Sequence, residues 1–281
     1  MARQKRVAAI HDISCFGKCS LTVALPILSA AGIEACAIPT AVLSTHTGVP
    51  GYTYRDLTED ILPIISHWQA LGLPFDAIYT GFLGSFQQLD LVSEVFRRLR
   101  SKDTMVLVDP VMGDNGALYR TFPKEFPAGM RRLCAQADVI VPNMTEASLL
   151  LEEPYQEGPY TPAYIKRLLR ALSGLGPRKV VLTGVCFDQN QLGAATLDAG
   201  TQKVEYLFET RVEGYYHGTG DIFASVLAAA LLKGCDLTEA ASAAVEFTAE
   251  SIARTKEAGT DVRFGVNFEA GLLKLSAQLE L

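Results

Sequence analysis

Short apolar runs alternate with amphipathic segments along most of the chain. The runs predict buried strands, and the segments between them repeat apolar residues at helical spacing. The predicted strands are 6–11, 35–43, 77–80, 104–108, 139–141 and 179–183, and the predicted helices lie near 20–31, 57–71, 86–100, 124–134, 144–152 and 162–173. This alternation predicts an α/β fold, with a mostly parallel central sheet that carries helices on both faces.

The pattern changes after Gly184. Two runs of alternating polarity, 191–197 and 203–209, are joined by Asp-Ala-Gly at 198–200, which predicts a small hairpin at the edge of the sheet. An Ala- and Leu-rich helix follows from residue 221, and two more helices are expected at about 237–254 and 267–280. Because we find no linker or internal repeat, we expect a single domain over residues 1–281.

Composition narrows the classes of function. A chain of 281 residues that is 49% hydrophobic can bury one large core. Its formal charge of −6 and its lack of long Lys or Arg runs argue against nucleic-acid and anionic-membrane partners. No segment approaches the roughly 18 uninterrupted apolar residues of a membrane span. The six cysteines form no CxxC pair, and the apolar run 7–10 is too short for a signal peptide, so we expect a cytoplasmic protein.

A glycine-bracketed turn precedes the Ala- and Leu-rich helix. Gly218, Thr219 and Gly220 can bring bare backbone amides close to a ligand, so this turn can hold an anion. Asp221 follows in the first turn of the helix, where the macrodipole favours its ionised form. A proton acceptor beside an anion site is what phosphorylation of a hydroxyl group needs. The alternative is that the glycines only turn the chain and Asp221 only caps the helix.

Polar residues also follow three of the predicted strands. Asp109 ends the fourth strand, Asn143 and Glu146 follow the fifth, and Thr183 ends the sixth. The carboxyl ends of parallel strands share one edge of a sheet, where doubly wound sheets bind ligands, and a carboxylate there can hold Mg²⁺ through water. Two alternatives remain open. Asn143 and Glu146 also have the spacing of a capping box, and Thr183 also fits turn chemistry.

Three motifs occur in the order and rough spacing of the ribokinase-like vitamin kinases. They are Asp-Pro-Val-Met-Gly-Asp at 109–114, Pro-Asn-x-x-Glu at 142–146 and Gly-Thr-Gly-Asp at 218–221. Two N-terminal segments, Ile-His-Asp at 10–12 and Leu-Ser-Thr-His-Thr-Gly at 43–48, resemble the substrate-side segments of that family. The chain most resembles the pyridoxal/pyridoxamine kinases, over about residues 6 to 255. This resemblance implies a ribokinase-like fold.

The resemblance implies roles for the residues of these motifs. Asp221 is expected to take the proton from the substrate's hydroxymethyl group, beside an anion hole formed by residues 218–220. Asp109 and Glu146 are expected to organise Mg²⁺ and its waters. The residues expected near the nucleotide phosphates are Asn143 and Thr183.

The substrate side departs from the family in two places. Thr47 matches a position that touches the pyridine ring, and Ser44 and His46 belong to the same segment. Asp12 stands where the family commonly has serine, and Phe82 stands where tyrosine is usual. A carboxylate at position 12 favours a protonated ring or the ammonium group of pyridoxamine, unless it points away and caps the following helix.

Three histidines lie near the expected site. His11 and His46 belong to the substrate segments, and His217 directly precedes the anion turn. Each of them either contacts a ligand or serves only the structure. The sequence does not separate these two roles.

Together the motifs predict a kinase that uses ATP and Mg²⁺ to phosphorylate the 5′-hydroxymethyl group of pyridoxal, pyridoxamine or pyridoxine. One alternative is a hydroxymethylpyrimidine kinase. The corresponding turn of those enzymes resembles Gly-Thr-Gly-Cys, however, whereas this chain has Asp221 at the last position. A second alternative is a non-catalytic nucleotide- or vitamer-binding protein, against which the set of Asp109, Glu146 and Asp221 argues. From the resemblance alone, we expect a homodimer.

Overall fold

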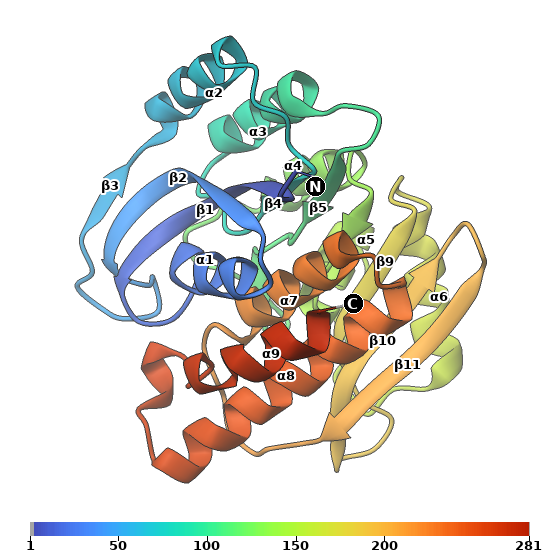
Figure 1. Ribbon diagram of the computed structural model, residues 1–281. Helices are drawn as coiled ribbons and strands as arrows, with labels where there is room; N and C mark the ends of the chain where they lie inside the picture. Colours follow the sequence, from blue (N-terminus) through green and yellow to red (C-terminus); the bar gives the residue numbers. More distant parts are fainter. Residues whose placement is uncertain (1–2, 281) are drawn as a thin grey trace.

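The computed structural model describes residues 3–280 and has a nine-stranded sheet at its centre (Figure 1). The strands of this sheet are β1 (Arg6–Phe16), β2 (Glu34–Thr45), β3 (Tyr54–Asp56), β4 (Ala77–Thr80), β5 (Met105–Val108), β8 (Val139–Ile140), β9 (Lys179–Val185), β10 (Gln191–Asp198) and β11 (Lys203–Thr210). Their order in space is β11-β10-β9-β8-β5-β4-β1-β2-β3. A separate two-stranded ribbon pairs β6 (Gly113–Asp114) with β7 (Ala117–Leu118).

The middle of the large sheet is parallel and its margins are antiparallel. The pairs from β2 through β1, β4, β5 and β8 to β9 are all parallel. At one edge β3 runs antiparallel to β2, and at the other β10 and β11 form an antiparallel hairpin beside β9. The predicted α/β fold, with its mostly parallel sheet and its edge hairpin, is therefore confirmed.

Helices cover both faces of the sheet. They are α1 (Leu21–Ala30), α2 (Ile61–Ala70), α3 (Phe86–Leu99), α4 (Phe126–Cys134), α5 (Met144–Leu151), α6 (Pro162–Ser173), α7 (Thr219–Lys233), α8 (Leu237–Ala258) and α9 (Leu272–Leu279). Successive strand residues point to opposite faces, so Ala8 and Ile10 of β1 join a core under α2 to α6, while Val7 joins a core under α1 and α7 to α9. No helix within residues 3–280 has the length and apolar character needed to cross a membrane.

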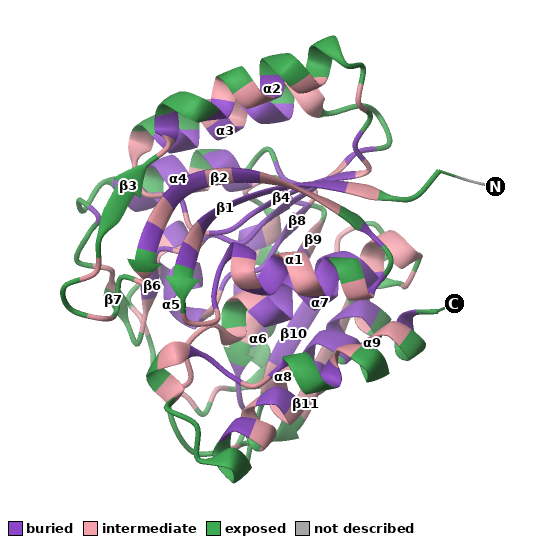
Figure 2. Ribbon diagram, turned by 60° about the vertical axis from the view of Figure 1, so that its left-hand side comes forward, coloured by how far each residue is buried: buried purple, intermediate pink, exposed green. Residues whose placement is uncertain are grey.

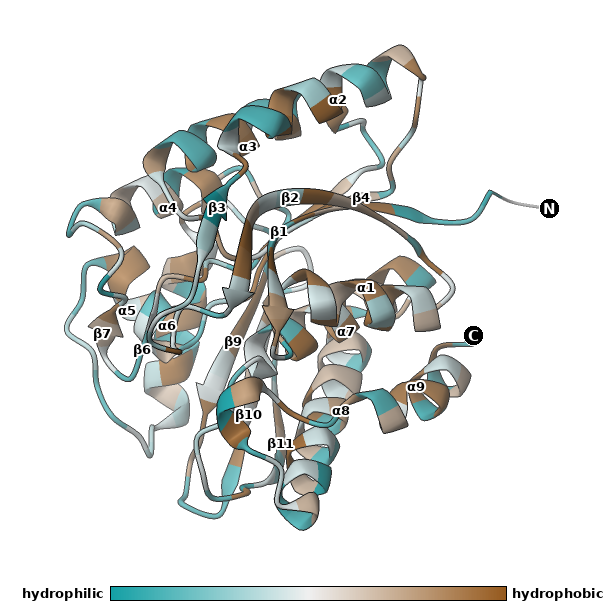
Figure 3. Ribbon diagram, turned by 90° about the vertical axis from the view of Figure 1, so that its left-hand side faces the viewer, coloured by the Kyte–Doolittle hydropathy of each residue, from teal (hydrophilic) through white to brown (hydrophobic). Residues whose placement is uncertain are grey.

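The outer helices α2 and α3 each have one buried and one exposed face. On α2 and α3 the outward sides are exposed and the sides toward the sheet are buried (Figure 2). Hydrophilic and hydrophobic stretches alternate along the same two helices (Figure 3). This alternation is the amphipathic repeat that predicted these helices from the sequence.

Helix α7 lies inside the fold instead of on its surface. Every residue from Ile222 to Ala230 is buried, and the helix packs against α1 and α8. On the sheet side, the hydroxyl of Tyr79 in β4 lies 3.1 Å from the hydroxyl of Ser225. Because the body of the helix is held on several sides, its N-terminal turn has a fixed position at the carboxyl ends of the central strands.

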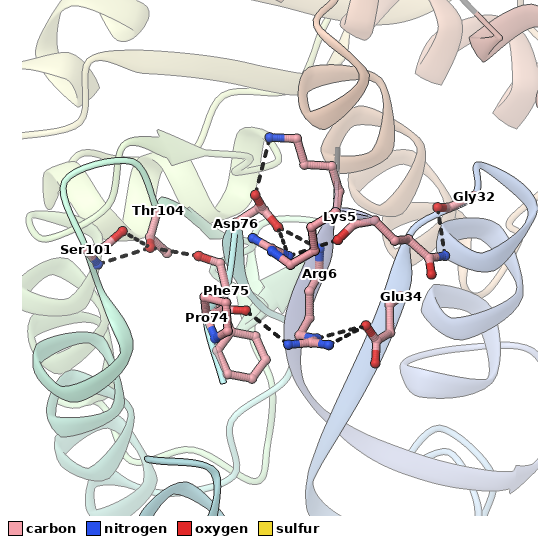
Figure 4. A network of polar contacts seen from close by, with 11 residues as sticks. Lys5, Arg6, Gly32, Glu34, Pro74, Phe75, Asp76, Ser101 and Thr104 are labelled. Carbon is pink, nitrogen blue, oxygen red and sulfur yellow. Dashed lines mark hydrogen bonds and ion pairs between the residues drawn. The ribbon is translucent and has the colours of Figure 1, made fainter. Parts of the chain in front are cut away.

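A polar network ties together the opposite ends of the strands, away from that turn (Figure 4). Asp76 accepts a hydrogen bond from the backbone amide of Arg6 (2.8 Å) and one from the ammonium group of Lys5 (3.2 Å). The guanidinium group of Arg6 in turn donates to Glu34 (2.8 Å). These contacts join the starts of β1, β2 and β4.

The structure differs from the sequence prediction mainly at element ends and in very short strands. β1 and β2 continue past residues 11 and 43 because they pair with each other as far as Phe16 and Thr45. The helix predicted at 57–71 begins at Ile61 after a 3₁₀ turn, and the one predicted at 267–280 begins at Leu272 after another. The two- and three-residue strands β3, β6 and β7 are too short to show a period.

Candidate active site

A cleft of about 400 Å³ opens at the carboxyl ends of the central strands. It brings together residues that are far apart in the sequence. Eight residues expected to bind nucleotide or to catalyse phosphoryl transfer line it, as the shared sheet edge predicts: Asp109, Asn143, Glu146, Thr183, Gly218, Thr219, Gly220 and Asp221.

The glycine-bracketed turn forms the start of α7. Gly218 is the N-cap residue and has a left-handed backbone, with φ of 75°. A Cβ atom at this position would lie 2.0 Å from the backbone oxygen of Lys18, so only glycine fits between the loop and the turn. The helix begins at Thr219, two residues earlier than predicted, which places the backbone amides of residues 219–221 in its first turn. The first backbone amides of an α-helix have no hydrogen-bond acceptor within the helix, so these amides can bind an anion.

The carboxylate of Asp221 also lies in this first turn. Burial raises the pKa of Asp221 to about 7, a backbone hydrogen bond from Ser20 opposes that rise, and the nearby charge of Asp12 adds to it. A carboxylate with a pKa near neutrality holds and releases a proton within the physiological pH range, which is what a general base must do.

Asn143 and Glu146 form the capping box that the sequence allowed. The backbone amide of Glu146 donates to Asn143 Oδ1 (2.8 Å), and the backbone amide of Asn143 donates to Glu146 Oε2 (2.9 Å). Glu146 Oε1 also accepts a hydrogen bond from the backbone amide of Met112 (3.2 Å), next to the motif that begins with Asp109. Glu146 therefore caps α5 and also joins two of the strand-end motifs.

Asp109 and Glu146 both line the cleft, and their carboxyl groups interact with each other. Burial, followed by the charges of Glu146 and Asp221, raises the pKa of Asp109 well above its usual value. Burial also raises the pKa of Glu146, while hydrogen bonds from the backbone of Asn143 and Met112 oppose the shift. Neighbouring buried carboxylates of this kind favour a proton or a cation between them. Within residues 3–280, no group of three or more His, Cys, Asp or Glu side chains is placed to hold a metal ion.

Asn143 and Thr183 are neighbours across the sheet edge. They form an isolated parallel bridge, and the backbone amide of Thr183 donates to the carbonyl of Pro142 (2.9 Å). The side-chain amide of Asn143 donates to the carbonyl of Gly113 (3.0 Å). The two residues thus line the same side of the cleft from adjacent strand ends.

The residues predicted for the substrate side do not line this cleft. Asp12 also does not take the helix-capping role that the sequence left open. Asp12 lies inside β1, and its carboxylate accepts hydrogen bonds from the hydroxyls of Ser20 (2.5 Å) and Ser14 (3.3 Å). It therefore does not cap the helix that follows, whose N-cap residue is Ser20. Its exposed fraction is only 4%.

The other substrate-side residues occupy the end of β2 and the segment after β4. Ser44 is exposed and accepts a hydrogen bond from the backbone amide of Thr53 (2.8 Å). Thr47 lies exposed in the turn that follows β2. Phe82 is half-buried, and its ring packs against that of Phe122 at a centroid distance of 5.5 Å.

The three histidines have different environments. His11 is fully buried in β1, where burial lowers its pKa to about 3, and its ring meets that of Tyr79 edge-on at 4.4 Å. The ring of His46 accepts a hydrogen bond from the backbone amide of Gly48 and contacts the carbonyl of Arg263. Its centroid lies 4.6 Å from that of His217, which lines the cleft. Burial lowers the pKa of His217, and the neighbouring His46 lowers it further.

Sequence reasoning missed two parts of the site. The hydroxyl of Tyr215 donates to Asp114 (2.7 Å), which joins the β6–β7 ribbon to the segment before the anion turn. The cleft also has a wall from α8, formed by Val245, Thr248, Ala249 and Ile252. The repeat of small and apolar residues in α8 predicted a packed helix, and nothing in that repeat separates a cleft wall from core.

Fold and site together define a ribokinase-like kinase of small alcohols. The model of the family described as phosphomethylpyrimidine kinase matches residues 25–265. The chain therefore belongs to that family, which agrees with the resemblance to ribokinase-like vitamin kinases seen in the sequence.

Individual relatives refine this placement. A protein of Bacteroides thetaiotaomicron, assigned as a phosphomethylpyrimidine kinase and solved with pyridoxal, is 40% identical, with a TM-score of 0.93 over 97% of this chain and 96% of that one. A pyridoxine/pyridoxal/pyridoxamine kinase of Bordetella avium is 31% identical over 89% of this chain and 85% of its own length. The pyridoxal kinase of Leishmania donovani with ADP and pyridoxamine is 25% identical, with a TM-score of 0.87 over 97% of this chain and 96% of that one.

The carboxylates that line the cleft predict that the ligand-free protein loses stability as the pH rises. Asp109, Glu146 and Asp221 have raised pKa values in the folded state, so folding retains protons that the unfolded chain releases above about pH 4. His11, whose folded pKa is lowered, acts in the opposite direction only below about pH 6.5. We therefore expect Tm in EDTA to fall between about pH 6.5 and 8.5.

The matched control for this measurement is Asp221→Asn, which removes one of the titrating groups. Its Tm should fall less steeply than that of the wild type over the same pH range. A wild-type Tm that is flat or that rises over this range would contradict the raised pKa values.

Proposed function

We propose that this protein is an ATP-dependent kinase that phosphorylates the 5′-hydroxymethyl group of pyridoxal, pyridoxamine or pyridoxine. The observation that carries this proposal is the placement of Asp221, a carboxylate with a pKa near 7, in the helix turn that also presents the free amides of residues 219–221 to the cleft. The relatives named above include kinases of these vitamers and structures with pyridoxal, pyridoxamine and ADP.

Each part of the turn has a task in the transfer. Asp221 accepts the hydroxyl proton as the substrate oxygen forms a bond to the γ-phosphorus of ATP. The bond from that phosphorus to the bridging oxygen breaks, and its electron pair remains on ADP. The amides of residues 219–221, together with the positive end of the α7 dipole, stabilise the negative charge on the transferring group.

The nucleotide is held between the strand ends and α8. Asn143 and Thr183 lie near its phosphates, and the apolar wall from α8 offers a surface for the base. Asp109 and Glu146 would hold Mg²⁺ through its water molecules, because their oxygens are the hard ligands that this ion prefers. When bound, Mg²⁺ neutralises charge on the phosphates.

The vitamer occupies the side of the site formed by the ends of β1 and β2. In this proposal Thr47 touches the pyridine ring, and Asp12, Ser44, His46 and Phe82 surround it. We further propose a single kinase domain that acts as a cytoplasmic homodimer, as the resemblance to vitamin kinases implies. No nucleic-acid or membrane partner is expected.

A second candidate is phosphorylation of a hydroxymethylpyrimidine, which the description of the matching family favours. Asp221 argues for the vitamin B6 substrates, since this turn in the pyrimidine kinases resembles Gly-Thr-Gly-Cys and has no aspartate. A panel of pyridoxal, pyridoxamine, pyridoxine and hydroxymethylpyrimidine, each with MgATP, separates the two activities by ADP release. If none of the four alcohols gave ADP release, the result would favour a non-catalytic binding protein.

Asp221→Asn tests the proposed general base. The substitution preserves the shape of the side chain and removes its basicity, so kcat should fall by roughly 10²- to 10⁴-fold. KM for pyridoxal should change little, because the carboxylate acts on the proton and not on the ring. Steady-state ADP release measures both values, and turnover near the wild-type level would exclude Asp221 as the base.

Glu146→Gln separates the cap of α5 from the organisation of Mg²⁺. Gln serves at the same position of a capping box, so the helix should remain intact and Tm should change little. If Glu146 also orders the waters of Mg²⁺, the concentration of Mg²⁺ that gives half-maximal rate should rise. A Mg²⁺ titration at saturating ATP and pyridoxal measures this concentration, and a curve that matches the wild type would restrict Glu146 to capping.

Asp12→Ser tests whether the departure at position 12 reads the substrate. A carboxylate near the ring favours a protonated ring or an ammonium group, so kcat/KM for pyridoxamine relative to pyridoxal should fall several-fold in the variant. The ratio cancels any loss of catalysis that is common to both vitamers. Equal ratios in the wild type and the variant, both folded, would show that Asp12 does not distinguish them.

A further inference from the structure

Ser20 has an unusual backbone conformation next to the proposed site. Its φ is 53° and its ψ is −132°, a region that side chains other than glycine rarely adopt. It is the N-cap residue of α1, yet its hydroxyl makes no capping hydrogen bond, although serine commonly makes one at that position. The strained backbone and the diverted hydroxyl suggest that the residue serves another purpose.

The hydroxyl of Ser20 points toward a carboxylate instead of toward the helix that it precedes. Its hydroxyl donates to Asp12 Oδ1 at 2.5 Å, and both side chains are at least 95% buried, with exposed fractions of 5% and 4%. The loop that carries Ser20 adjoins the turn of Asp221, since a Cβ atom at Gly218 would lie 3.7 Å from the Cα atom of Cys19. Ser20 thus ties the carboxylate of Asp12 in β1 to a loop that packs against the start of α7.

The loop that carries Ser20 has little room to relax. The backbone oxygen of Lys18 would lie 2.0 Å from a Cβ atom at Gly218 and 2.6 Å from a Cβ atom at Gly265. The backbone amide of Lys18 also donates to the carbonyl of Phe264 (2.9 Å). The loop is therefore held between the anion turn on one side and residues 264–265 on the other.

We propose that Ser20 is a positioning residue for the turn that carries Asp221, and that its hydroxyl bond to Asp12 holds the strained backbone conformation in which the loop of residues 18–20 packs against that turn. This inference rests on the proposed role of Asp221 as general base. A hydrogen bond to an ionised carboxylate is short and strong, so the bond to Asp12 can offset the strain. Glycine would adopt the same backbone without strain but would lack the bond that fixes it.

Three variants test this arrangement, with pyridoxal and MgATP as substrates. Ser20→Ala removes the bond to Asp12 and keeps the backbone penalty, so the loop of residues 18–20 should shift against the turn that carries Asp221. Ser20→Gly removes the same bond and also the penalty. Ser14→Ala is the matched control, because Ser14 donates to the other oxygen of Asp12 at 3.3 Å and lies in β1, outside the loop of residues 18–20.

We expect kcat to fall roughly 10- to 100-fold in Ser20→Ala, the range that a displacement of a reacting group by about 1 Å can cause. Ser20→Gly should lose less, so that kcat decreases in the order wild type, Ser20→Gly, Ser20→Ala. KM for pyridoxal and for ATP should change less than twofold, and Ser14→Ala should retain kcat within about twofold of the wild type. Tm should be higher for Ser20→Gly than for Ser20→Ala.

The proposal is overturned if Ser20→Ala retains wild-type kcat, if Ser20→Gly is as slow as Ser20→Ala, or if Ser14→Ala loses as much as Ser20→Ala. A loss that appears in KM instead of kcat would assign Ser20 to substrate binding and would also overturn it. Asp221→Asn, measured alongside, separates the two levels of the argument. If that variant stays active, the general base itself is wrong; if only the Ser20 variants stay active, Asp221 is the base without help from Ser20.

Discussion

Acidic side chains gather around the amino end of one buried helix, and the site depends on that concentration of negative charge. Asp12, Asp109, Glu146 and Asp221 come from β1, from the end of β5, from α5 and from α7, and burial raises the pKa of each of them. Like charges at such close range are unfavourable unless protons, donors or cations separate them. The positive end of the α7 dipole, backbone amides and hydroxyls supply part of this compensation. In the proposed reaction, a magnesium nucleotide complex supplies the rest.

The fold makes this arrangement possible because it fixes each carboxylate from a different rigid element. Parallel strands bring their carboxyl ends to one edge, so Asp109 and the 142–146 motif meet without any contact in sequence. Helix α7 cannot retreat from that edge, since Ile222 to Ala230 are all buried. The network of Lys5, Arg6, Glu34 and Asp76 joins the opposite ends of the strands. Stability and chemistry are thus separated at the two ends of the same sheet.

The sequence predicted those parts of the site that follow from strand order and local pattern. Asp109, Asn143, Glu146, Thr183 and the turn 218–221 lie together because each follows an apolar run or precedes a helix that the pattern predicts. Ser20 was not predicted, because its loop packs against residues 218 and 265, which lie far from it in the sequence. The contact of Tyr215 with Asp114 joins residues 101 positions apart, which no local pattern encodes. Strands β3, β6 and β7 were not predicted, because an alternating hydrophobic pattern cannot be recognised over three residues or fewer.

Glu146 shows why a local explanation and a functional one need not exclude each other. Its capping box accounts for one carboxylate oxygen, which accepts from the backbone of Asn143, while the other accepts from the backbone of Met112. Each oxygen has a second lone pair, so a carboxylate that caps a helix can still order the waters of a cation. The cap also holds the side chain in one position, which reduces the entropy lost when a ligand binds. A residue already fixed by the backbone is therefore well suited to hold a metal through water.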